Sequence, residues 1–485
     1  MAEIIGRERE RRMLCQWYAS TGAEFVVVYG RRRVGKTFLI REMFKEGMTF
    51  YHTALSPMEM GSKGQMARQL QNFHYSLRRY GYEGGICPRD WYEAFESLIH
   101  LLESKPRDKR MMVFIDEMPW MDTPRSGFVS ALEHFWNGWG AGRDNLFLVV
   151  CGSATSWISH RLIGNKGGLY GRVTHELKLS PFTLMECEEY FKKRNIVMDR
   201  YSLMESYMIL GGIPYYLSFF QPGMSLAQNI DQLCFRRDGN LTLEFERLYG
   251  SIFSSPELFI RVVKVLSQKR EGLTRGEICE KTGLSTGGGL SNILAALEVS
   301  DFITSYYYYG RPRREIYYRV TDFYSLFYLR FIAGNKTNNP HYWEQNRATP
   351  AIAAWRGYTF ELLCFTHIAQ IKRALGISGI HSEVSPWRYV NNGGEGSKRG
   401  AQIDLIIDRA DRVVSLCEMK CLTSELTIDK DLADDLRGKA EALRMTTKGR
   451  KGIQTVIVTT YGIRPGQYVE GVQGVVTIDA LFAGV

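Results

Sequence analysis

The chain has 485 residues, of which 45% are hydrophobic and 24% are charged. A single hydrophobic core stops growing at about 250 to 300 residues, so this length predicts several domains, and the composition excludes a disordered chain. The 62 Lys and Arg against 52 Asp and Glu give a formal charge of +10. This charge suits a polyanionic partner such as nucleic acid, but it equally suits simple solubility.

The sequence also lacks membrane and secretion signals. No uncharged apolar run approaches the roughly 18 residues that a membrane span requires, and the amino terminus lacks the apolar stretch of a signal peptide. We therefore expect a cytoplasmic protein without a membrane partner. The nine cysteines are scattered and form no CxxC pair, which argues against a disulfide framework or a zinc site.

An apolar run from Phe25 to Tyr29 is followed at once by the sequence GRRRVGKT. The run predicts a buried parallel strand, and the residues after it match the phosphate-loop pattern GxxxxGK[ST]. In such a loop backbone amides surround the phosphates, Lys36 reaches the β- and γ-phosphates, and the Thr37 hydroxyl ligates Mg²⁺. The sequence therefore predicts ATP and Mg²⁺ as cofactors, bound by Gly30, Arg31, Arg32, Arg33, Val34, Gly35, Lys36, Thr37 and Phe38.

Two further apolar runs end in polar residues. Met111 to Ile115 is followed by Asp116 and Glu117. We expect Asp116 to hold the Mg²⁺ shell and Glu117 to orient and deprotonate the attacking water beside the γ-phosphate. The run from Leu146 to Val150 leads to Ser153, which either senses the γ-phosphate or is a plain turn residue.

In combination these motifs resemble the archaeal ATPase family of the AAA+ and STAND grouping. The resemblance covers about the first 330 residues and also rests on Ile5-Gly6-Arg7-Glu8, Tyr170-Gly171-Arg172 and Gly211-Gly212-Ile213-Pro214. It implies that Ile5 and Gly6 lie near the adenine and that Pro214, in a helical lid, closes over the base. It also makes Arg172 a candidate arginine finger, the alternative being a surface or salt-bridged arginine. Should Arg172 act in trans, hydrolysis requires a nucleotide-dependent homo-oligomer; the sequence leaves cis and trans open.

Residues 256–330 have the order of a winged helix. Three helical segments with a turn at Gly283 predict a helix-turn-helix, and the runs Ile303 to Tyr309 and Glu315 to Val320 predict a two-stranded wing. Arginines at the wing tip are placed to meet DNA phosphates, unless the module only docks against other domains: Arg311, Arg313 and Arg314. The expected recognition helix opens with three glycines and carries no Lys or Arg, so reading of a specific DNA sequence is improbable.

The last part of the chain carries a carboxylate and lysine pattern on two expected strands, residues 400–407 and 413–420. Glu418 and Lys420 are two residues apart on one strand and so face the same side. We expect Asp404 and Glu418 to ligate a metal, Lys420 to position or activate water, and Glu361 in an upstream helix to complete the metal site. Lys439, in the following helix, is interpreted as part of a solvated face rather than as a phosphate contact.

This pattern resembles the PD-(D/E)xK restriction-endonuclease-like superfamily over roughly the last 140 residues. Ile403 precedes Asp404 where the superfamily pattern has proline. The resemblance implies a Mg²⁺-dependent nuclease acting on DNA. The alternative is a domain that keeps the fold while its chemistry has lapsed.

The sequence therefore predicts a multidomain α/β chain with four parts: a P-loop NTPase core with a parallel sheet at 1–176, a helical lid at 177–255, a winged helix at 256–330, and a restriction-endonuclease-like α/β domain at 340–485. Our leading hypothesis is an ATPase whose nucleotide state controls a DNA nuclease. One rival is an ATP-dependent signalling or regulatory switch with a lapsed carboxyl-terminal domain. The other is a winged-helix DNA-binding regulator.

Overall fold

The computed structural model describes residues 3–56, 64–153, 155–164, 167–253, 255–285, 287–335, 339–389, 401–447 and 449–484. The chain divides into two compact units. Unit 1 comprises Met1–Pro181, Glu246–Phe259 and Asn292–Asp301, and unit 2 comprises Phe182–Phe245, Ile260–Ser291 and Phe302–Val485. The boundaries of the four predicted domains stay predictions. None of the described helices is both long and apolar enough to cross a membrane. Gly400, at the start of one predicted strand, lies outside the described residues.

A five-stranded parallel sheet of order β2-β3-β4-β1-β5 forms the centre of unit 1. Its strands are β1 (Glu24–Tyr29), β2 (Met48–Thr53), β3 (Met111–Asp116), β4 (Leu146–Gly152) and β5 (His175–Lys178). Three of them, β1, β3 and β4, were predicted from their apolar runs, and they are buried because a parallel sheet is covered on both faces. Since β4 lies between β1 and β3, the three polar strand ends predicted from the sequence are neighbours.

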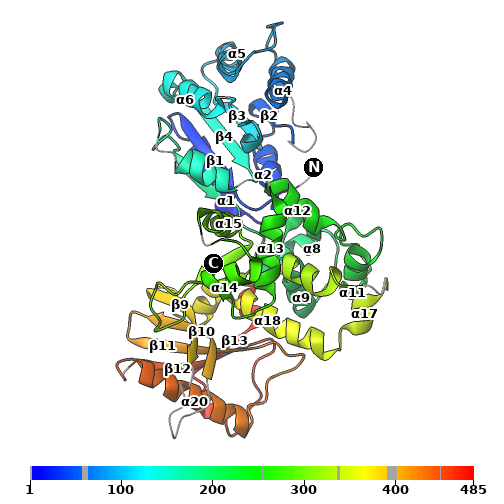
Figure 1. Cartoon of the computed structure of the whole chain (residues 1–485), viewed down its shortest axis with the longest axis vertical. Helices are drawn as coiled ribbons and strands as arrows, with labels where there is room; N and C mark the ends of the chain where they lie inside the picture. The colour runs from blue at the N-terminus through cyan, green and yellow to red at the C-terminus, as the bar shows by residue number, and fades with distance from the viewer. Residues whose placement is uncertain are drawn as a thin grey trace. The chain divides into compact units, whose positions relative to one another are not determined.

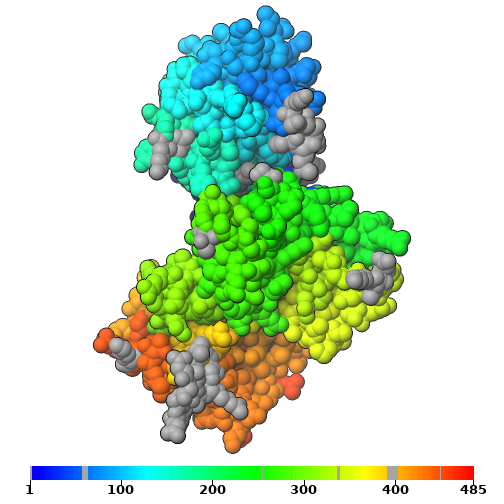
Figure 2. All heavy atoms as spheres, viewed as in Figure 1, coloured from blue at the N-terminus to red at the C-terminus, as the bar shows by residue number. Residues whose placement is uncertain are grey.

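Helices cover both faces of this sheet (Figure 1). They include α1 (Glu8–Tyr18), α2 (Lys36–Met43), α4 (Gln65–Arg79), α5 (Trp91–Glu103), α6 (Phe128–Gly138) and α7 (Thr155–Trp157). Alternate strand residues point to opposite faces, so Phe25 and Val27 join the core that α4, α5 and α6 build. On the other face Tyr18 and Phe44 pack against Phe147, with ring centroids 5.3 and 5.6 Å away. Figure 2 shows the residues coloured blue to cyan as one continuous body.

Unit 2 begins with the helices of the predicted lid, α8 (Leu184–Lys193), α9 (Arg200–Leu210), α10 (Pro214–Leu217) and α11 (Leu226–Ile230). Helix α9 is buried from Leu203 to Leu210 without interruption, so it is a core helix rather than a surface helix with one apolar stripe. It ends at Gly211, whose φ of 70° is a left-handed conformation that glycine adopts without strain. The division between the two units falls within α12 (Glu244–Ile252), α13 (Pro256–Ser267) and α15 (Gly288–Val299).

A small antiparallel sheet of order β6-β8-β7 follows, with α14 (Arg275–Thr282) beside it. Its strands are β6 (Leu273–Thr274), β7 (Ile303–Tyr306) and β8 (Tyr317–Val320). The two wing strands are therefore shorter than predicted, and β6 was not predicted. Strand β7 ends early because the chain leaves the ladder: the Tyr309 amide donates to the Pro386 carbonyl instead, at 2.9 Å. The predicted turn at Gly283 is present, with φ at 70°.

The carboxyl-terminal part of unit 2 is a mixed sheet of order β13-β12-β11-β10-β9. Its strands are β9 (Ser382–Tyr389), β10 (Ala401–Arg409), β11 (Val413–Lys420), β12 (Gly452–Thr459) and β13 (Gly474–Thr477). Strands β9, β10 and β11 pair antiparallel, whereas β11, β12 and β13 pair parallel. A parallel pair needs a crossover, which α20 (Lys430–Thr446) supplies between β11 and β12.

Further helices complete unit 2: α16 (Phe323–Phe327), α17 (Tyr342–Asn346), α18 (Pro350–Thr366), α19 (Ile368–Ala374) and α21 (Ile478–Leu481).

In β10 the register with β9 shifts between Ile403 and Ile406. Such an irregularity re-aims the side chains around it, and here it contains Asp404.

Candidate functional site

The predicted phosphate loop joins β1 to α2 and encloses the ammonium group of Lys36. Lys36 Nζ donates to the carbonyls of Gly30 and Arg31 at 2.9 and 3.0 Å. Positive φ angles at Gly30, Arg33 and Gly35 turn the chain around this group. Burial lowers the pKa of Lys36, while the charge of Glu117 acts in the opposite direction. Gly35 borders open space, since a Cβ there would meet no atom within 4 Å. The loop therefore presents a positive charge and an uncrowded backbone in the way that phosphate binding requires.

The two predicted Mg²⁺ ligands, Thr37 and Asp116, are in direct contact. Thr37 Oγ1 donates to Asp116 Oδ2 at 2.8 Å, and Asp116 lies at the end of β3 with 4% of its surface exposed. The other oxygen, Oδ1, accepts from the Glu117 amide at 2.9 Å and from the Cys151 thiol. Burial raises the pKa of Asp116, and the Cys151 hydrogen bond opposes that rise. A hydroxyl beside a carboxylate is the oxygen donor set that Mg²⁺ uses together with nucleotide phosphates, so these two residues fit the ion.

Glu117, the predicted base, is held by the end of the neighbouring strand. Ser153 Oγ lies 3.0 and 2.9 Å from the two Glu117 carboxylate oxygens, and the Ser153 amide donates to Oε2 at 3.1 Å. Glu117 itself has a φ of 50°, a left-handed conformation that is strained for a residue with a side chain. Ser153 therefore positions the Glu117 carboxylate at the same sheet edge as the phosphate loop.

The segment before α1 reaches the same loop. Arg7 is 5% exposed, and its guanidinium donates to the Val34 carbonyl at 3.3 Å. Ile5 and Gly6 directly precede it in the sequence, and their expected place near the adenine stays a prediction. Sequence reasoning used Arg7 only as part of a motif and missed this contact, and it likewise missed Cys151. No local pattern signals the Arg7 contact, because Arg7 and Val34 are 27 residues apart and meet only in the fold.

Arg172 is not brought to the phosphate loop of its own chain. It is exposed in the turn that precedes β5, where the Thr174 amide donates to the Phe25 carbonyl. Since β5 runs parallel to β1, this turn lies at the amino-terminal edge of the sheet and the loop at the other edge. Gly30 is five residue steps along the strand from Phe25, roughly 16 Å.

Two other residues predicted to bind the nucleotide are Pro214 and Phe38. Pro214 begins α10 in unit 2, so its predicted place over the base stays a prediction. Phe38, in the first turn of α2, exposes 41% of its surface.

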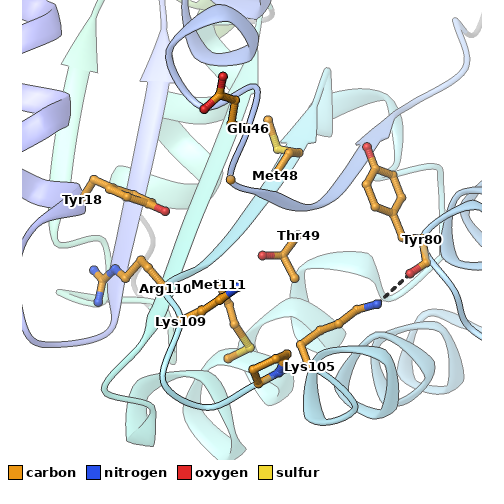
Figure 3. Close-up of a pocket in the computed structure, with 11 residues that line it drawn as sticks. Tyr18, Glu46, Met48, Thr49, Tyr80, Lys105, Lys109, Arg110 and Met111 are labelled. Carbon is orange, nitrogen blue, oxygen red and sulfur yellow. Dashed lines mark hydrogen bonds between the residues drawn. The ribbon is translucent and has the colours of Figure 1, made fainter.

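A cavity of about 510 Å³ also lies in unit 1, but at the other edge of the sheet (Figure 3). Met48 and Met111, which begin β2 and β3, line it, together with Lys105 and Arg110. The Lys105 ammonium is directed to the Tyr80 carbonyl at 3.0 Å, which Figure 3 marks. This cavity is separate from the phosphate loop and its carboxylates.

In unit 2 the strands β10 and β11 bring three predicted residues together. Leu405 pairs with Cys417 across the antiparallel ladder, so Asp404 and Glu418 are the next residues along it, and the Met419 amide donates to Asp404 Oδ2 at 3.3 Å. Lys420 Nζ lies 2.8 Å from Glu418 Oε1, on the side of the strand that the two-residue spacing predicts. Burial and the charge of Glu418 raise the pKa of Asp404.

Glu361 in α18 belongs to the same electrostatic environment. Burial raises the pKa of Glu361 most strongly, and the negative charge of Asp404 adds to this, because two neighbouring carboxylates resist ionising together. Raised pKa values on clustered acids mark a candidate functional site.

The expectation for Lys439 was wrong. It does not lie on a solvated helix face: its side chain is 13% exposed, and its ammonium group contacts Glu418 Oε2 and Asp435 Oδ2, both at 2.9 Å. The apolar residues on the same helix, Leu436 and Leu443, pack into the core beneath, which turns Lys439 inward. The four-residue spacing between Asp435 and Lys439 predicts their ion pair, but not the contact with Glu418, which lies on another element.

Within the described ranges, three potential metal ligands, Asp231, His341 and Glu344, have ligand atoms that all lie within 4.8 Å of one another. Both Asp231 oxygens accept hydrogen bonds from backbone amides, from Trp343 at 2.7 Å and Glu344 at 3.0 Å. Asp231 therefore satisfies amides in the first turn of α17. The predicted set Glu361, Asp404 and Glu418 is not gathered within that distance as it stands.

Comparison with known proteins supports an ATPase domain in the first part of the chain. Residues 4–220 match the model of a family described as an ATPase domain predominantly from Archaea. This match supports ATP binding and hydrolysis. An uncharacterised protein of Methanocaldococcus jannaschii is 25% identical over 340 residues, which are 68% of this chain and 69% of that protein.

Solved structures give a more distant likeness. The Walker-type ATPase PABY2304 of Pyrococcus abyssi is 18% identical with a TM-score of 0.48, covering 67% of this chain and 96% of that one. The ORC2 protein of Aeropyrum pernix is 13% identical with a TM-score of 0.39, covering 67% and 93%. TM-scores this low do not establish a common fold.

Proposed function

We propose that this protein binds and hydrolyses ATP with Mg²⁺ at the carboxyl-terminal edge of the sheet in unit 1. The observation that carries the proposal is that Lys36 and Thr37, at the start of α2, lie at the same edge of the sheet as Asp116 and Glu117, with Thr37 in contact with Asp116. Lys36 and the loop amides bind the phosphates, while Thr37 and Asp116 hold the ion. Glu117 takes the proton from the attacking water, a step that needs a carboxylate near the γ-phosphate rather than on the metal.

Two substitutions separate binding from chemistry. Lys36→Ala removes the cation that meets the phosphates, so calorimetry in magnesium buffer should detect no ATP uptake. Glu117→Gln keeps the shape but cannot accept a proton, so it should bind ATP while its turnover number falls by about 10²- to 10⁴-fold, the usual contribution of a general base. A Glu117→Gln protein that turns over normally would remove Glu117 from this role.

We also propose that the carboxyl-terminal part of unit 2 is a metal-dependent nuclease acting on DNA, whose position the nucleotide state controls. Asp404, Glu418 and Lys420 on adjacent strands support it, with Glu361 nearby and the re-aimed backbone around Asp404. The divalent ion would supply Lewis-acid activation of water. Asp404, Glu418 and Glu361 would hold it, and Lys420 would orient the water. DNA would contact this site and exposed arginines of the predicted wing, such as Arg311.

A nuclease assay on several DNA substrates with Mg²⁺ or Mn²⁺ and ATP at low salt tests this part. Asp404→Ala and Lys420→Ala should abolish cleavage and leave ATP turnover unchanged. Lys36→Ala, run in parallel, should alter the dependence of cleavage on ATP. Intact DNA after prolonged incubation with the unaltered protein would refute the nuclease function, while ATP hydrolysis would stand.

A regulatory ATP switch is the second candidate, and one observation favours it. Both oxygens of Glu418 are engaged by lysine ammonium groups, as expected of a structural ion pair where metal chemistry has lapsed. The exposed position of Arg172, away from its own phosphate loop, further suits an arginine finger that acts in trans. Light scattering with and without ATP tests it: a switch assembles into a homo-oligomer with nucleotide, and Arg172→Ala then slows hydrolysis.

A further inference from the structure

Glu418 is 3% exposed, and two cations share its carboxylate. Lys420 Nζ lies 2.8 Å from Oε1, and Lys439 Nζ lies 2.9 Å from Oε2. A buried carboxylate without a cation is strongly destabilising, so these two contacts stabilise the folded chain around Glu418. They also occupy the oxygens that a metal ion would use.

The two lysines differ in the anionic partner that each keeps when it no longer contacts Glu418. Lys439 contacts Asp435 as well, at 2.9 Å, and Asp435 is 55% exposed in side chain on the solvent side of α20. An ammonium that leaves Glu418 therefore keeps an anionic partner near water and is not left as an unpaired buried charge. Lys420 lies two residues from Glu418 on the same strand and face, so it stays beside the carboxylate.

We propose that Lys439 is an internal counter-ion for Glu418, which a divalent cation displaces when it enters the site formed by Glu361, Asp404 and Glu418. This inference rests on the proposed nuclease function. Lys439 thus acts as a positioning residue: it holds the Glu418 carboxylate in place before the metal arrives and competes with the metal for it.

Mn²⁺ binding to the nucleotide-free full chain tests the competition directly. The titrations use an Asp116→Asn background, which removes the metal ligand of the ATPase site, and a Glu418→Gln variant defines the heat that belongs to the second site. Lys439→Met removes the competing charge while keeping the length of the side chain. Its Mn²⁺ affinity should rise on the order of tenfold, because a hydrogen bond to a charged group no longer has to be broken.

Two controls separate competition from damage to the helix. Lys439→Arg keeps a cation on Glu418 and should bind Mn²⁺ as the parent does. Lys430→Ala removes an exposed lysine from the first turn of the same helix and should also leave the affinity unchanged. Thermal unfolding of each variant shows whether α20 remains folded.

The outcomes distinguish the two proposals. Tighter Mn²⁺ binding by Lys439→Met than by the parent, with unchanged controls, supports the counter-ion proposal. Detectable binding by Lys439→Met but not by the parent supports it as well. Equal or weaker binding by a folded Lys439→Met protein overturns it and leaves the metal site standing. If neither the parent nor Lys439→Met binds Mn²⁺, the metal site itself fails and the counter-ion with it.

Discussion

At the scale of single residues, the ATPase site depends on contacts between neighbouring strand ends. Asp116 has one oxygen directed to Thr37 and the other to the Cys151 thiol, and Glu117 is held by Ser153. Each side chain is oriented by a partner from the next strand of the sheet. The site is thus set by the order of the strands as well as by the motif.

The Cys151 contact leads to a prediction. Cys151→Val keeps an apolar side chain in the buried site but removes the donor to Asp116 Oδ1, so the carboxylate loses one orienting hydrogen bond. The KM for Mg-ATP should rise about three- to tenfold, the usual effect of one hydrogen bond. Cys151→Ser keeps a donor and should restore the parent value in steady-state assays over a range of Mg²⁺. Equal values for the Val and Ser variants would exclude this role.

At the scale of elements, the two glycines of the phosphate loop have different tasks. Gly30 has a φ of 140°, and a Cβ there would lie 2.2 Å from the Leu179 carbonyl oxygen, which follows β5. The Leu179 amide in turn donates to the Tyr29 carbonyl at 2.7 Å, so neither chain segment can move away easily. Gly35 has a φ of 93° but open space around it.

Alanine at these positions should therefore have separable effects. Gly30→Ala combines strain with a backbone clash and should lower the free energy of unfolding by more than about 3 kcal/mol. Gly35→Ala carries strain alone, about 1 to 3 kcal/mol, and places a methyl group where phosphates bind. Urea unfolding and ATP calorimetry on both proteins check this: Gly35→Ala should lose affinity while remaining the more stable variant. The reverse order of stability would contradict it.

The elements show what the sequence could and could not predict. Strands β1, β3 and β4 came from their apolar runs, and the phosphate loop came from its motif. The first wing strand, β7, is shorter than predicted because the Tyr309 amide donates to the carbonyl of Pro386, which is far away in the sequence. Lys439 was misplaced for the same kind of reason: its partner Glu418 is on another element. Local pattern predicts elements well, whereas contacts between elements decide which side chains turn inward.

At the scale of the whole molecule, stability should depend on pH through buried neutral histidines. His367 is 2% exposed; its Nε2 accepts from the Leu184 amide at 3.2 Å, and its Nδ1 lies 3.1 Å from the Leu363 carbonyl. Burial lowers the pKa of His367 from its ordinary 6.5 to about 4. The unfolded chain therefore binds a proton that the folded chain refuses between these values. The stabilisation is fully present above pH 6.5 and is lost as the pH falls towards 4.

At pH 5 this single group should cost on the order of 2 kcal/mol relative to pH 7. His367→Gln does not titrate, so its urea midpoint should fall less between pH 7 and pH 5 than that of the parent. His341, whose side chain is 64% exposed, gives the matched control, and His341→Gln should follow the parent. Parallel losses in all three proteins would show that His367 does not carry the effect.

The contacts of helix α9 predict which truncated forms of this chain can fold. Its Glu205 is fully buried between the guanidinium groups of Arg347 and Arg356, each 2.7 Å away, and Arg356 belongs to α18. A truncated chain that stops before residue 340, intended as an ATPase with its lid, would lack both arginines that neutralise this carboxylate and would open the apolar core around it to water. Such a fragment should precipitate or unfold. Truncations that keep the predicted lid together with α18 are therefore the ones to try first.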